Sequence, residues 1–495
     1  MGAGTSDRSS QERRLAWLVF ALLFCSYAYF WQGGGWNPNI RLDLTRAIAA
    51  ENTIAIDAYW QNSGDWAYRG GRYYSTKAPG LSVVAIPFYV IGKTGARLAG
   101  ASPENILLVS GYVANLGANA LPSALLGVVL FHVLGWLGMP GARRRAGVAL
   151  AFGLGTPAFA YATAFYAHQG AAAFGFGAFA LLLGAERYSH PRAWAAAAGA
   201  AAGVAVLYEL TLVVVVVVLG AWLWLDRERR PLLRWFLIGG APAVLLLGSY
   251  QWNAFGSPFA TGYDFTNPNA ETRVDGSLFG WPSPIHMLEM LFGTYRGLLP
   301  LSPIFILAPI GWPVLWRTHR AAAAVCLAVS MGFLLLISSF HAWDAGFSTG
   351  PRYLMPCLPF LFVLVGFGIA RFWRVGAMLA AVSVAIMFSV TLVSIDLPIR
   401  VRYPLLQYIY PHLMQGHVSL NTYSLDSYSP PEKWQNDMNS FNLGELVFPY
   451  SLMSATPLLA LWLGLGTAAW QSARRIDQTL RNFDSDDQTS GDTPA

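Results

Sequence analysis

Long apolar segments alternate with short polar stretches along almost the whole chain. A helix needs about 20 apolar residues to cross the hydrocarbon layer of a bilayer, and most of these segments approach that length. Because backbone polar groups must be satisfied internally in lipid, the pattern predicts an all-α, polytopic bundle of transmembrane helices. We expect twelve spans, near residues 15–31, 106–138, 147–165, 168–185, 193–208, 210–225, 235–254, 299–316, 321–340, 353–370, 375–394 and 451–470.

The composition supports this class. Hydrophobic residues make up 55% of the chain and charged residues 12%, whereas soluble domains carry about a quarter charged residues. The net charge of +6 does not indicate nucleic-acid binding, because the arginines form short clusters between apolar segments, as membrane topology requires. Cys25, Cys326 and Cys357 lie in or beside apolar segments without metal or disulfide spacing, so we expect them to be packing residues.

The basic clusters predict the orientation. Clusters of arginine mark the cytoplasmic side of a membrane protein. They lie at residues 13–14, 143–145, 227–234, 317–320, 371–374 and 474–475. Twelve spans place all of them on one side, with both termini cytoplasmic. The run Leu81–Leu98, interrupted by Pro87, Gly92 and Lys93, would break this parity, so we expect a re-entrant or interfacial helix there. The alternative is a thirteenth span.

This topology divides the chain into a transmembrane domain, residues 1–470, and a polar cytoplasmic tail, 471–495, that we expect to be disordered. The long first outer loop, 32–80, and the last, 395–450, face outward from the plasma or inner membrane. The inner loops are short and contain no phosphate-cradling glycine loop, which disfavours nucleotide chemistry on that side. The candidate chemistry therefore gathers on the extracytoplasmic face.

The first outer loop carries three aspartates and an unusual lysine. Asp43, Asp57 and Asp65 would lie near the lipid headgroups, where a carboxylate can take a proton from an attacking hydroxyl. The alternative is that they are solvated loop residues or helix caps. Lys77 is one of only three lysines, against 29 arginines, and its ammonium group suits a lipid phosphate. Its alternative role is that of a lysine snorkelling at the interface.

Two short outer turns add candidates. Tyr166 and His168 lie between two spans, where His168 could donate to a sugar or phosphate oxygen, although a histidine at the interface is also common. Glu209 interrupts the apolar run 193–225. An ionisable group in such a run is a functional candidate, and the alternative is a residue that marks a surface turn.

The segment 340–360 offers a third group in one outer turn: His341, Trp343, Asp344 and Arg352. Arg352, like Arg296 in YRGLLPLSP, is an arginine on the outer side and needs a partner. A phosphate or Asp344 could be the partner of Arg352. Trp343 could stack on a sugar ring or belong to the aromatic belt at the interface.

These segments together resemble the GT-C class of polytopic glycosyltransferases, especially the bacterial protein O-mannosyltransferases and aminoarabinose transferases. The matching segments are LDLTRAI (42–48), YYSTKAPG (73–80), AFYAHQG (164–170), FGSPFATGY (255–263), YRGLLPLSP (295–303) and GFSTGPRYLMPCLPF (346–360). The resemblance implies a polyprenyl-phosphate-linked sugar donor and a first outer loop with juxtamembrane helices and a catalytic carboxylate. It also implies that Lys77 and Arg352 contact the lipid phosphate.

One departure from the family affects the catalytic assignment. Many relatives carry an acidic pair shortly after the first span, where this chain reads Trp36-Asn37-Pro38-Asn39. The role would then fall to Asp43, Asp57 or Asp65. We rank Asp57 first, because the apolar and aromatic residues around it predict a partly shielded setting that would raise the pKa of its carboxyl group.

The sequence thus predicts a glycosyltransferase of the cell envelope that transfers a sugar, with inversion, from a polyprenyl phosphate to a glycan, lipid or protein acceptor. No cofactor is expected. A divalent metal would fit the chemistry, but no His/Asp cluster has ligand spacing. The alternatives are another lipid-phosphate transferase, such as a phosphoryl-group transferase or polysaccharide ligase, and a transporter or flippase of a lipid-linked glycan. No internal repeat or ionisable pair at the membrane midplane supports transport.

Overall fold

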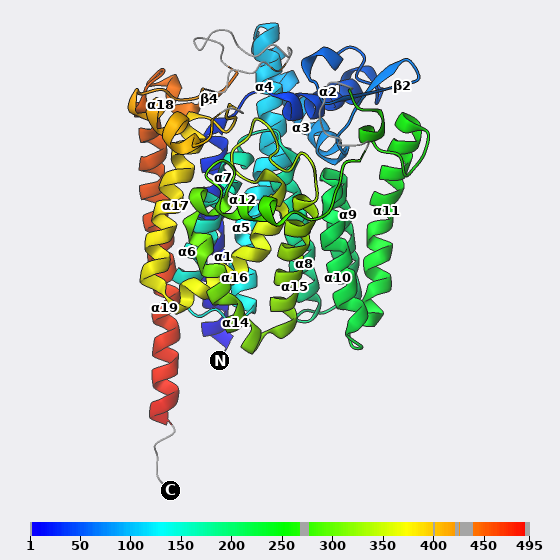
Figure 1. Ribbon diagram of the computed structural model, residues 1–495. Helices are drawn as coiled ribbons and strands as arrows, with labels where there is room; N and C mark the ends of the chain where they lie inside the picture. Colours follow the sequence, from blue (N-terminus) through cyan, green and yellow to red (C-terminus); the bar gives the residue numbers. More distant parts are fainter. Residues whose placement is uncertain (1, 268–276, 399–400, 421–424, 426–438, 491–495) are drawn as a thin grey trace.

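The computed structural model describes residues 2–267, 277–398, 401–420, 425 and 439–490 and confirms the all-α, polytopic fold. Figure 1 shows long, roughly parallel helices that form one bundle, with short elements gathered at its upper end. The helices are α1 (Gly2–Ala28), α2 (Trp36–Glu51), α3 (Gly80–Leu98), α4 (Pro103–Asn115), α5 (Leu121–Trp136), α6 (Ala142–Gly155), α7 (Ala158–Ala162), α8 (Ala167–Ala185), α9 (Pro191–Tyr208), α10 (Val213–Leu225), α11 (Arg230–Phe255), α12 (Pro284–Phe292), α13 (Leu298–Leu301), α14 (Ala308–Thr318), α15 (Arg320–Ser338), α16 (Leu358–Arg371), α17 (Trp373–Val393), α18 (Tyr410–Met414) and α19 (Thr456–Ser490).

Helices occupy all twelve predicted spans. In the described part of the chain, eight helical stretches are long and apolar enough to cross a membrane by themselves. The longest is Pro103–Trp136, in which α4 and α5 are joined through a π-helical turn at Leu116–Ala120. Other predicted spans are divided into shorter pieces. The span at 147–165, for example, consists of α6 and α7, separated at Thr156 and Pro157.

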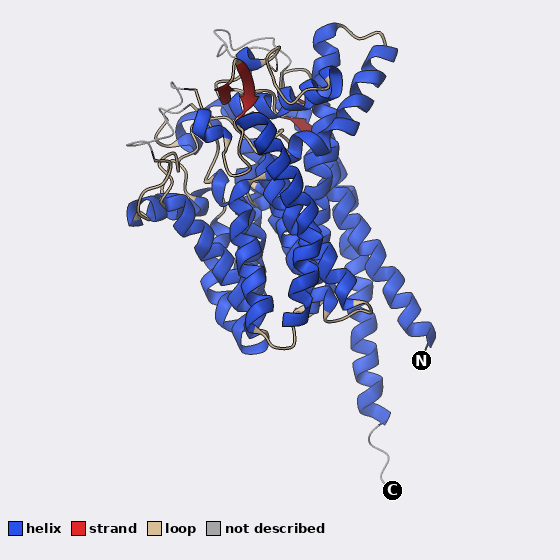
Figure 2. Cartoon of the chain, turned by 90° about the vertical axis from the view of Figure 1, so that its right-hand side faces the viewer, coloured by secondary structure: helices blue, strands red, loops and turns tan. Residues whose placement is uncertain are grey.

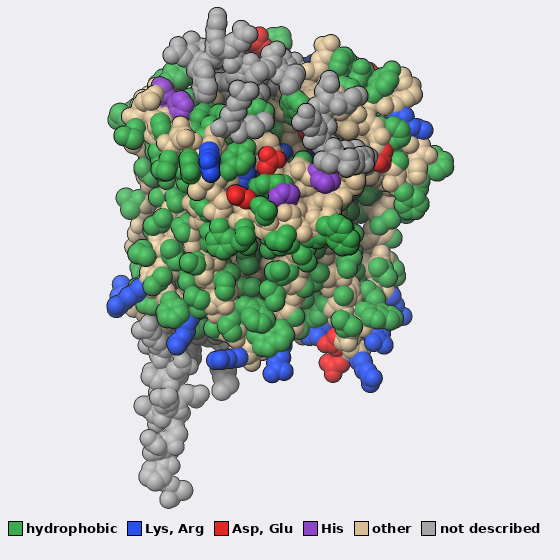
Figure 3. Space-filling model, viewed as in Figure 1, with side chains coloured by type: hydrophobic (Ala, Val, Ile, Leu, Met, Phe, Trp, Pro, Cys, Tyr) green, Lys and Arg blue, Asp and Glu red, His purple; other side chains and the backbone are tan. Residues whose placement is uncertain are grey.

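The two ends of the bundle differ in chemistry. The N-terminal end of α1 and the C-terminal end of α19 lie at the same end, opposite α2 and the strands of the first outer loop (Figures 1 and 2). Between the ends runs an apolar belt, and lysine and arginine side chains gather along its lower edge in Figure 3. This arrangement agrees with the one-sided placement of the basic clusters. That the lower end faces the cytoplasm remains a prediction.

The run 81–98 forms one continuous helix, α3, with Pro87 inside it, packed against α4. It is long and apolar enough to cross a membrane, so its place as an interfacial or re-entrant helix or as a further span stays a prediction. One local prediction needs correction. The segment 471–490, predicted to be disordered, is helical as the end of α19. Residues 491–495 of the predicted tail, and 399–400, 421–424 and 426–438 of the last outer loop, lie outside the described residues.

The outer loops form small structures that cover the upper end of the bundle. In the first loop, α2 is followed by a hairpin of β2 (Trp66–Arg69) and β3 (Arg72–Ser75). The last loop returns to the start of the chain, where β4 (Phe441–Asn442) pairs antiparallel with β1 (Phe30–Trp31). The first and last outer loops are therefore held together, although about 400 residues separate them in sequence.

Candidate functional site

The hairpin of the first outer loop places Asp65 beside Lys77. Gly70 and Gly71, both at positive φ, form the two-residue turn that a twisted hairpin favours. Asp65 directly precedes β2, and Lys77 follows β3 by one residue, so the two lie at the open end of the hairpin. The backbone N–H of Thr76 donates to the carbonyl of Asp65 at 3.2 Å, which closes this end.

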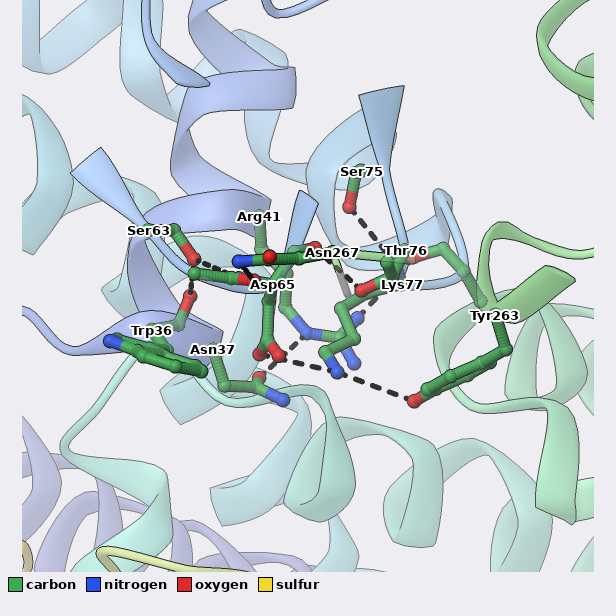
Figure 4. A network of polar contacts seen from close by, with 12 residues as sticks. Trp36, Asn37, Arg41, Ser63, Asp65, Ser75, Thr76, Lys77, Tyr263 and Asn267 are labelled. Atoms are coloured by element: carbon green, nitrogen blue, oxygen red, sulfur yellow. Dashed lines mark hydrogen bonds and ion pairs between the residues drawn. The ribbon is translucent and has the colours of Figure 1, made fainter. Parts of the chain in front are cut away.

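The ammonium group of Lys77 has two side-chain partners within the protein (Figure 4). Its Nζ lies 3.2 Å from Asp65 Oδ2 and donates to the hydroxyl of Tyr263 at 3.3 Å. Burial by itself would lower the pKa of Lys77, but Asp65 and Tyr263 more than offset that effect, so the pKa lies above its ordinary value. Lys77 is therefore a permanently charged group, with a side chain that is 9% exposed.

Two close contacts explain how separate segments reach Lys77. A Cβ on Gly80, at the start of α3, would lie 2.4 Å from the backbone carbon of Leu207 in α9, so only glycine allows this approach. A Cβ on Gly262 would lie 2.5 Å from Cα of Thr76. Gly262 begins the 3₁₀ helix Gly262–Phe265, which carries Tyr263. The two glycines thus bring the end of α9 and the loop after α11 against the same lysine.

Arg41 of α2 connects the same segments and was missed by the sequence analysis. Its side chain is buried. Its Nε donates to Asn37 Oδ1 at 3.0 Å, and Nη1 lies 3.3 Å from the carbonyl oxygens of Ala78 and Tyr208. Its Nη2 forms an ion pair with Glu209. Arg41 therefore joins α2, the segment after Lys77 and the end of α9 into one rigid corner.

Glu209 brings His168 into this corner. The Oε1 atom that pairs with Arg41 also lies 3.5 Å from His168 Nδ1. His168 is 2% exposed, and its other ring nitrogen, Nε2, has no hydrogen-bond partner. Its ring stacks on Tyr166, with centroids 6.2 Å apart, and meets Tyr353 edge-on at 5.5 Å. The two residues predicted from separate turns, His168 and Glu209, are direct neighbours.

Arg352 is the third cation near His168. It begins the 3₁₀ helix Arg352–Cys357 and is 8% exposed. Its guanidinium carbon lies 5.0 Å from the ring centre of Tyr166 and 5.3 Å from that of Tyr353. Among the described residues, no acidic side chain forms an ion pair with it, and its Nε has no hydrogen-bond partner. Asp344, one of the two predicted partners, does not pair with it.

These residues form one electrostatic unit. Arg352, Arg41 and Lys77 all act on His168, and Lys77 is also influenced by Tyr353. Asp65 balances the charge of Lys77 and Glu209 balances that of Arg41, whereas Arg352 has no such direct partner among the described side chains. A buried cation without an acidic partner favours binding of an anion. The site can therefore hold an anionic group next to aromatic rings and a neutral imidazole acceptor.

The structure does not support two of the three aspartates as members of this unit. Asp57, ranked first, does not lie in a shielded setting: its side chain is 42% exposed, and its Oδ2 forms an ion pair with Arg72 at 2.9 Å. Asp43 is buried, but it holds the fold of the loop, accepting from Asn62 at 3.0 Å and pairing with Arg46 at 3.2 Å. Only Asp65 lies at the cationic site.

The other predicted binding residues lie in the turn before Arg352. The Arg296 guanidinium donates to the backbone carbonyls of Asp344, Gly346 and Ser348, so it shapes the turn and does not await a phosphate. Trp343 stacks on His286 with centroids 5.0 Å apart, and His341 joins the turn to the chain at Leu278 through its backbone. Arg296, His341, Trp343 and Asp344 therefore contact other parts of the chain and stabilise the turn that precedes Arg352.

Some residues near the site carried signals in the sequence. Arg41 lies in an outer loop, and the argument applied to Arg296 and Arg352, that such an arginine needs a partner, applies to it equally. Asp396 directly follows the last apolar run before the last loop and is buried, and its Oδ1 accepts a hydrogen bond from the Tyr166 hydroxyl at 3.2 Å. In the described ranges, no group of three or more His, Cys, Asp or Glu side chains could hold a metal ion.

The fold and the site define a polytopic helical membrane protein with a buried cationic site at one end of its bundle. No family model matches the sequence, and no curated protein matches it. Among solved structures, the chain is similar to ArnT from Cupriavidus metallidurans bound to undecaprenyl phosphate, with a TM-score of 0.48, 17% identity, and coverage of 94% of this chain and 73% of that one. The apo form gives a TM-score of 0.44 at 16% identity, covering 73% and 60%.

A second similar structure is the archaeal oligosaccharyltransferase AglB from Archaeoglobus fulgidus in complex with an inhibitory peptide and a dolichol-phosphate. Its TM-score is 0.48 at 11% identity, with 86% of this chain and 61% of that chain covered. The chain spans 60–73% of the length of these structures. The likeness concerns the overall arrangement of helices, and the function must be argued from the site itself.

Proposed function

We propose that the protein is a glycosyltransferase that takes a sugar from a polyprenyl phosphate and transfers it to an acceptor at the extracytoplasmic face. The observation that carries the proposal is Arg352, a buried arginine with no acidic partner among the described side chains and an unsatisfied Nε. A phosphodiester has one negative charge and oxygen acceptors for the guanidinium group, so it matches this position in charge and geometry.

The surroundings of Arg352 suit the remainder of such a donor. Tyr166 and Tyr353 present aromatic rings beside the guanidinium group, and aromatic faces can cover a sugar ring. The apolar belt in Figure 3 lies between the two ends of the bundle, where a polyprenyl chain would remain in the bilayer. Lys77, although already paired with Asp65, adds a second fixed positive charge to the same unit.

In the proposed reaction, the acceptor oxygen or nitrogen attacks the anomeric carbon while the bond between that carbon and the phosphate oxygen breaks. The polyprenyl phosphate leaves with the bonding electron pair. Arg352 stabilises the charge that develops on the phosphate, as a preorganised cation does in a site that excludes water. Attack opposite the leaving phosphate gives inversion at the anomeric carbon. The reaction requires no nucleotide.

The experiment uses the full chain in proteoliposomes supplied with a series of radiolabelled polyprenyl-phosphate sugars and a membrane extract as acceptor. We expect free polyprenyl phosphate and a labelled acceptor to appear together, and both to form roughly 10–150-fold more slowly with the Arg352→Gln variant. Transfer of the donor's phosphate group to the acceptor would instead indicate a phosphoryl-group transferase. Movement of intact lipid-linked sugar across the bilayer, without release of the sugar, would indicate a flippase and overturn the proposal.

A further inference from the structure

The proposed reaction needs a group that takes the proton of the acceptor, and the carboxylates of the first outer loop are poorly arranged for this task. Asp57 is exposed and Asp43 holds the fold of the loop. Asp65 Oδ2 lies 3.2 Å from the ammonium group of Lys77, so this carboxylate is occupied by an ion pair within the protein. The base must therefore be sought among the other groups of the site.

His168 has the arrangement of an oriented base. Its Nδ1 lies 3.5 Å from Glu209 Oε1, and a carboxylate at this nitrogen favours the tautomer that carries its proton on Nδ1. The lone pair is then on Nε2, which is the buried ring nitrogen without a hydrogen-bond partner. A nitrogen that can accept a proton, held by a carboxylate on the opposite side of the ring, is the pairing used by histidine bases in general.

The remaining neighbours fix this arrangement. Arg41 holds Glu209 through an ion pair and is itself anchored to the backbone of Ala78 and Tyr208. The carboxylate that faces His168 therefore cannot rotate freely. Tyr166 stacks on one side of the imidazole ring, and Tyr353 meets its edge, which fixes the plane of the ring.

The charged and titratable groups around His168 come from every side of the site. They are Glu209 after α9, Arg41 of α2, Lys77 before α3, Arg352 and Tyr353 of the 3₁₀ helix before α16, and Tyr166 before α8. Burial, together with the cations Arg352, Arg41 and Lys77, favours the neutral imidazole over the imidazolium. A neutral imidazole is the form that can act as a base.

We propose that His168 is the catalytic base of the transfer and that Glu209 is the residue that positions it, an inference that rests on the proposed function. As the acceptor O–H attacks the anomeric carbon, its proton passes to His168 Nε2 and the phosphate leaves. Glu209 stabilises the imidazolium that forms. The proton then returns to solvent or to the departing phosphate. Nε2 is covered in this structure, so the acceptor reaches it only when the covering side chains move aside.

The test compares His168→Gln, Asp65→Asn and the wild-type chain in proteoliposomes, with the lipid-linked sugar of the preceding assay. Glutamine keeps a polar atom near the position of Nε2 but cannot take up a proton. We expect kcat to fall by about 10²–10⁴-fold, the usual contribution of general base catalysis, with KM for the donor nearly unchanged. The acidic limb of the pH profile of kcat/KM should disappear in His168→Gln and persist in Asp65→Asn.

A matched histidine provides the control. His132 of α5 stacks on Trp136 at the other end of that helix and is no part of the site, so His132→Gln should keep both kcat and the pH profile. In Glu209→Gln, which removes the positioning charge but leaves His168, we expect a smaller loss of kcat, about tenfold. If the Glu209 variant does not fold because Arg41 loses its partner, the His168 and Asp65 variants alone decide the question.

The outcomes separate the two proposals. Loss of the acidic limb in Asp65→Asn with its retention in His168→Gln would assign the base to Asp65 and overturn the role of His168. An increase in KM without a change in kcat in His168→Gln would assign it to binding only, and would also overturn it. If the wild-type chain releases no polyprenyl phosphate from any donor, the proposed function itself fails, and the role of His168 fails with it.

Discussion

Lys77 and Arg352 are both buried cations at the same end of the bundle, but their surroundings differ. Lys77 is enclosed by Asp65 and Tyr263, and its charge is neutralised within the hairpin of the first outer loop. Arg352 lies against aromatic rings and has an unsatisfied Nε. The first cation belongs to the architecture of the loop, and the second remains available for an external anion.

This difference changes the assignment that the sequence favoured. Lys77 stands out in the sequence because lysine is rare in this chain and because it precedes Ala-Pro-Gly. The structure shows that a rare charged residue can have its partner twelve residues away, across a hairpin that is not obvious from the apolar pattern. Arg352 is already set apart in the sequence by its predicted place on the outer side, and its environment in the structure is the unusual one.

The largest expected effect is on the folded state and comes from Lys77→Ala. Removing the ammonium group leaves Asp65, 18% exposed, without its counter-charge, and breaking such a buried pair costs about 3–5 kcal/mol. Unfolding by denaturant titration in detergent would measure this loss. The double variant Lys77→Met with Asp65→Asn removes both charges and should recover most of it. Wild-type stability of Lys77→Ala would contradict the architectural role.

Arg352→Gln should have the opposite profile, with a large loss of transfer and little loss of stability. A charged hydrogen bond to the phosphate contributes about 1.5–3 kcal/mol, so the rate should fall by roughly 10–150-fold. Arg296→Gln is the matched control, because its guanidinium group is held by backbone carbonyls and by the hydroxyl of Tyr295. That variant should lose stability instead. If Arg352→Gln lowers the free energy of unfolding but keeps the specific activity of the wild type, Arg352 is the architectural cation and the comparison with Lys77 is reversed.

Tyr166→Phe should have an intermediate effect. The substitution removes the hydroxyl that donates to Asp396 Oδ1 at 3.2 Å and leaves the ring that packs against Arg352. One buried hydrogen bond contributes about 0.5–1.5 kcal/mol net, so binding of farnesyl phosphate should weaken by no more than about tenfold. Tyr27→Phe, which loses a similar hydroxyl bond to the carbonyl of Gly153, serves as the control and should leave binding unchanged.

The smallest effect is expected for Asp57→Asn. Its ion pair with Arg72 is exposed, and such pairs contribute little to stability. Transfer should stay within about twofold of the wild type in the proteoliposome assay, because the carboxylate is not part of the cationic site. A loss as large as that of Arg352→Gln would restore Asp57 as the catalytic carboxylate of the first loop.

The sequence predicted the fold well because the apolar pattern depends on local composition. Helices appear at all twelve predicted spans. The hairpin of the first loop could also have been recognised, since Gly70-Gly71 between aromatic segments is a known turn signal. That signal, followed to its ends, would have paired Asp65 with Lys77.

The remainder of the site depends on tertiary contacts that no local pattern encodes. Arg41 and Glu209 are 168 residues apart, and beside their ion pair the glycine at position 80 lets α3 approach α9 closely. Asp396 is buried next to Gly35, which precedes it by more than 300 residues. The side chain of Asp57 is more exposed than that of Asp65, and this difference arises from the folded loop and not from the residues next to each aspartate in sequence.

The two-residue turn at Gly70 and Gly71 has a consequence for how this loop can vary. Side chains on a strand alternate between its two faces, so one inserted residue in the turn would shift β3 against β2 and turn its side chains to the opposite face. A Cβ at either glycine would meet nothing within 4 Å, so only the backbone conformation limits the choice of residue there. The tip of the hairpin should therefore tolerate Asn or Asp, but its length should be fixed.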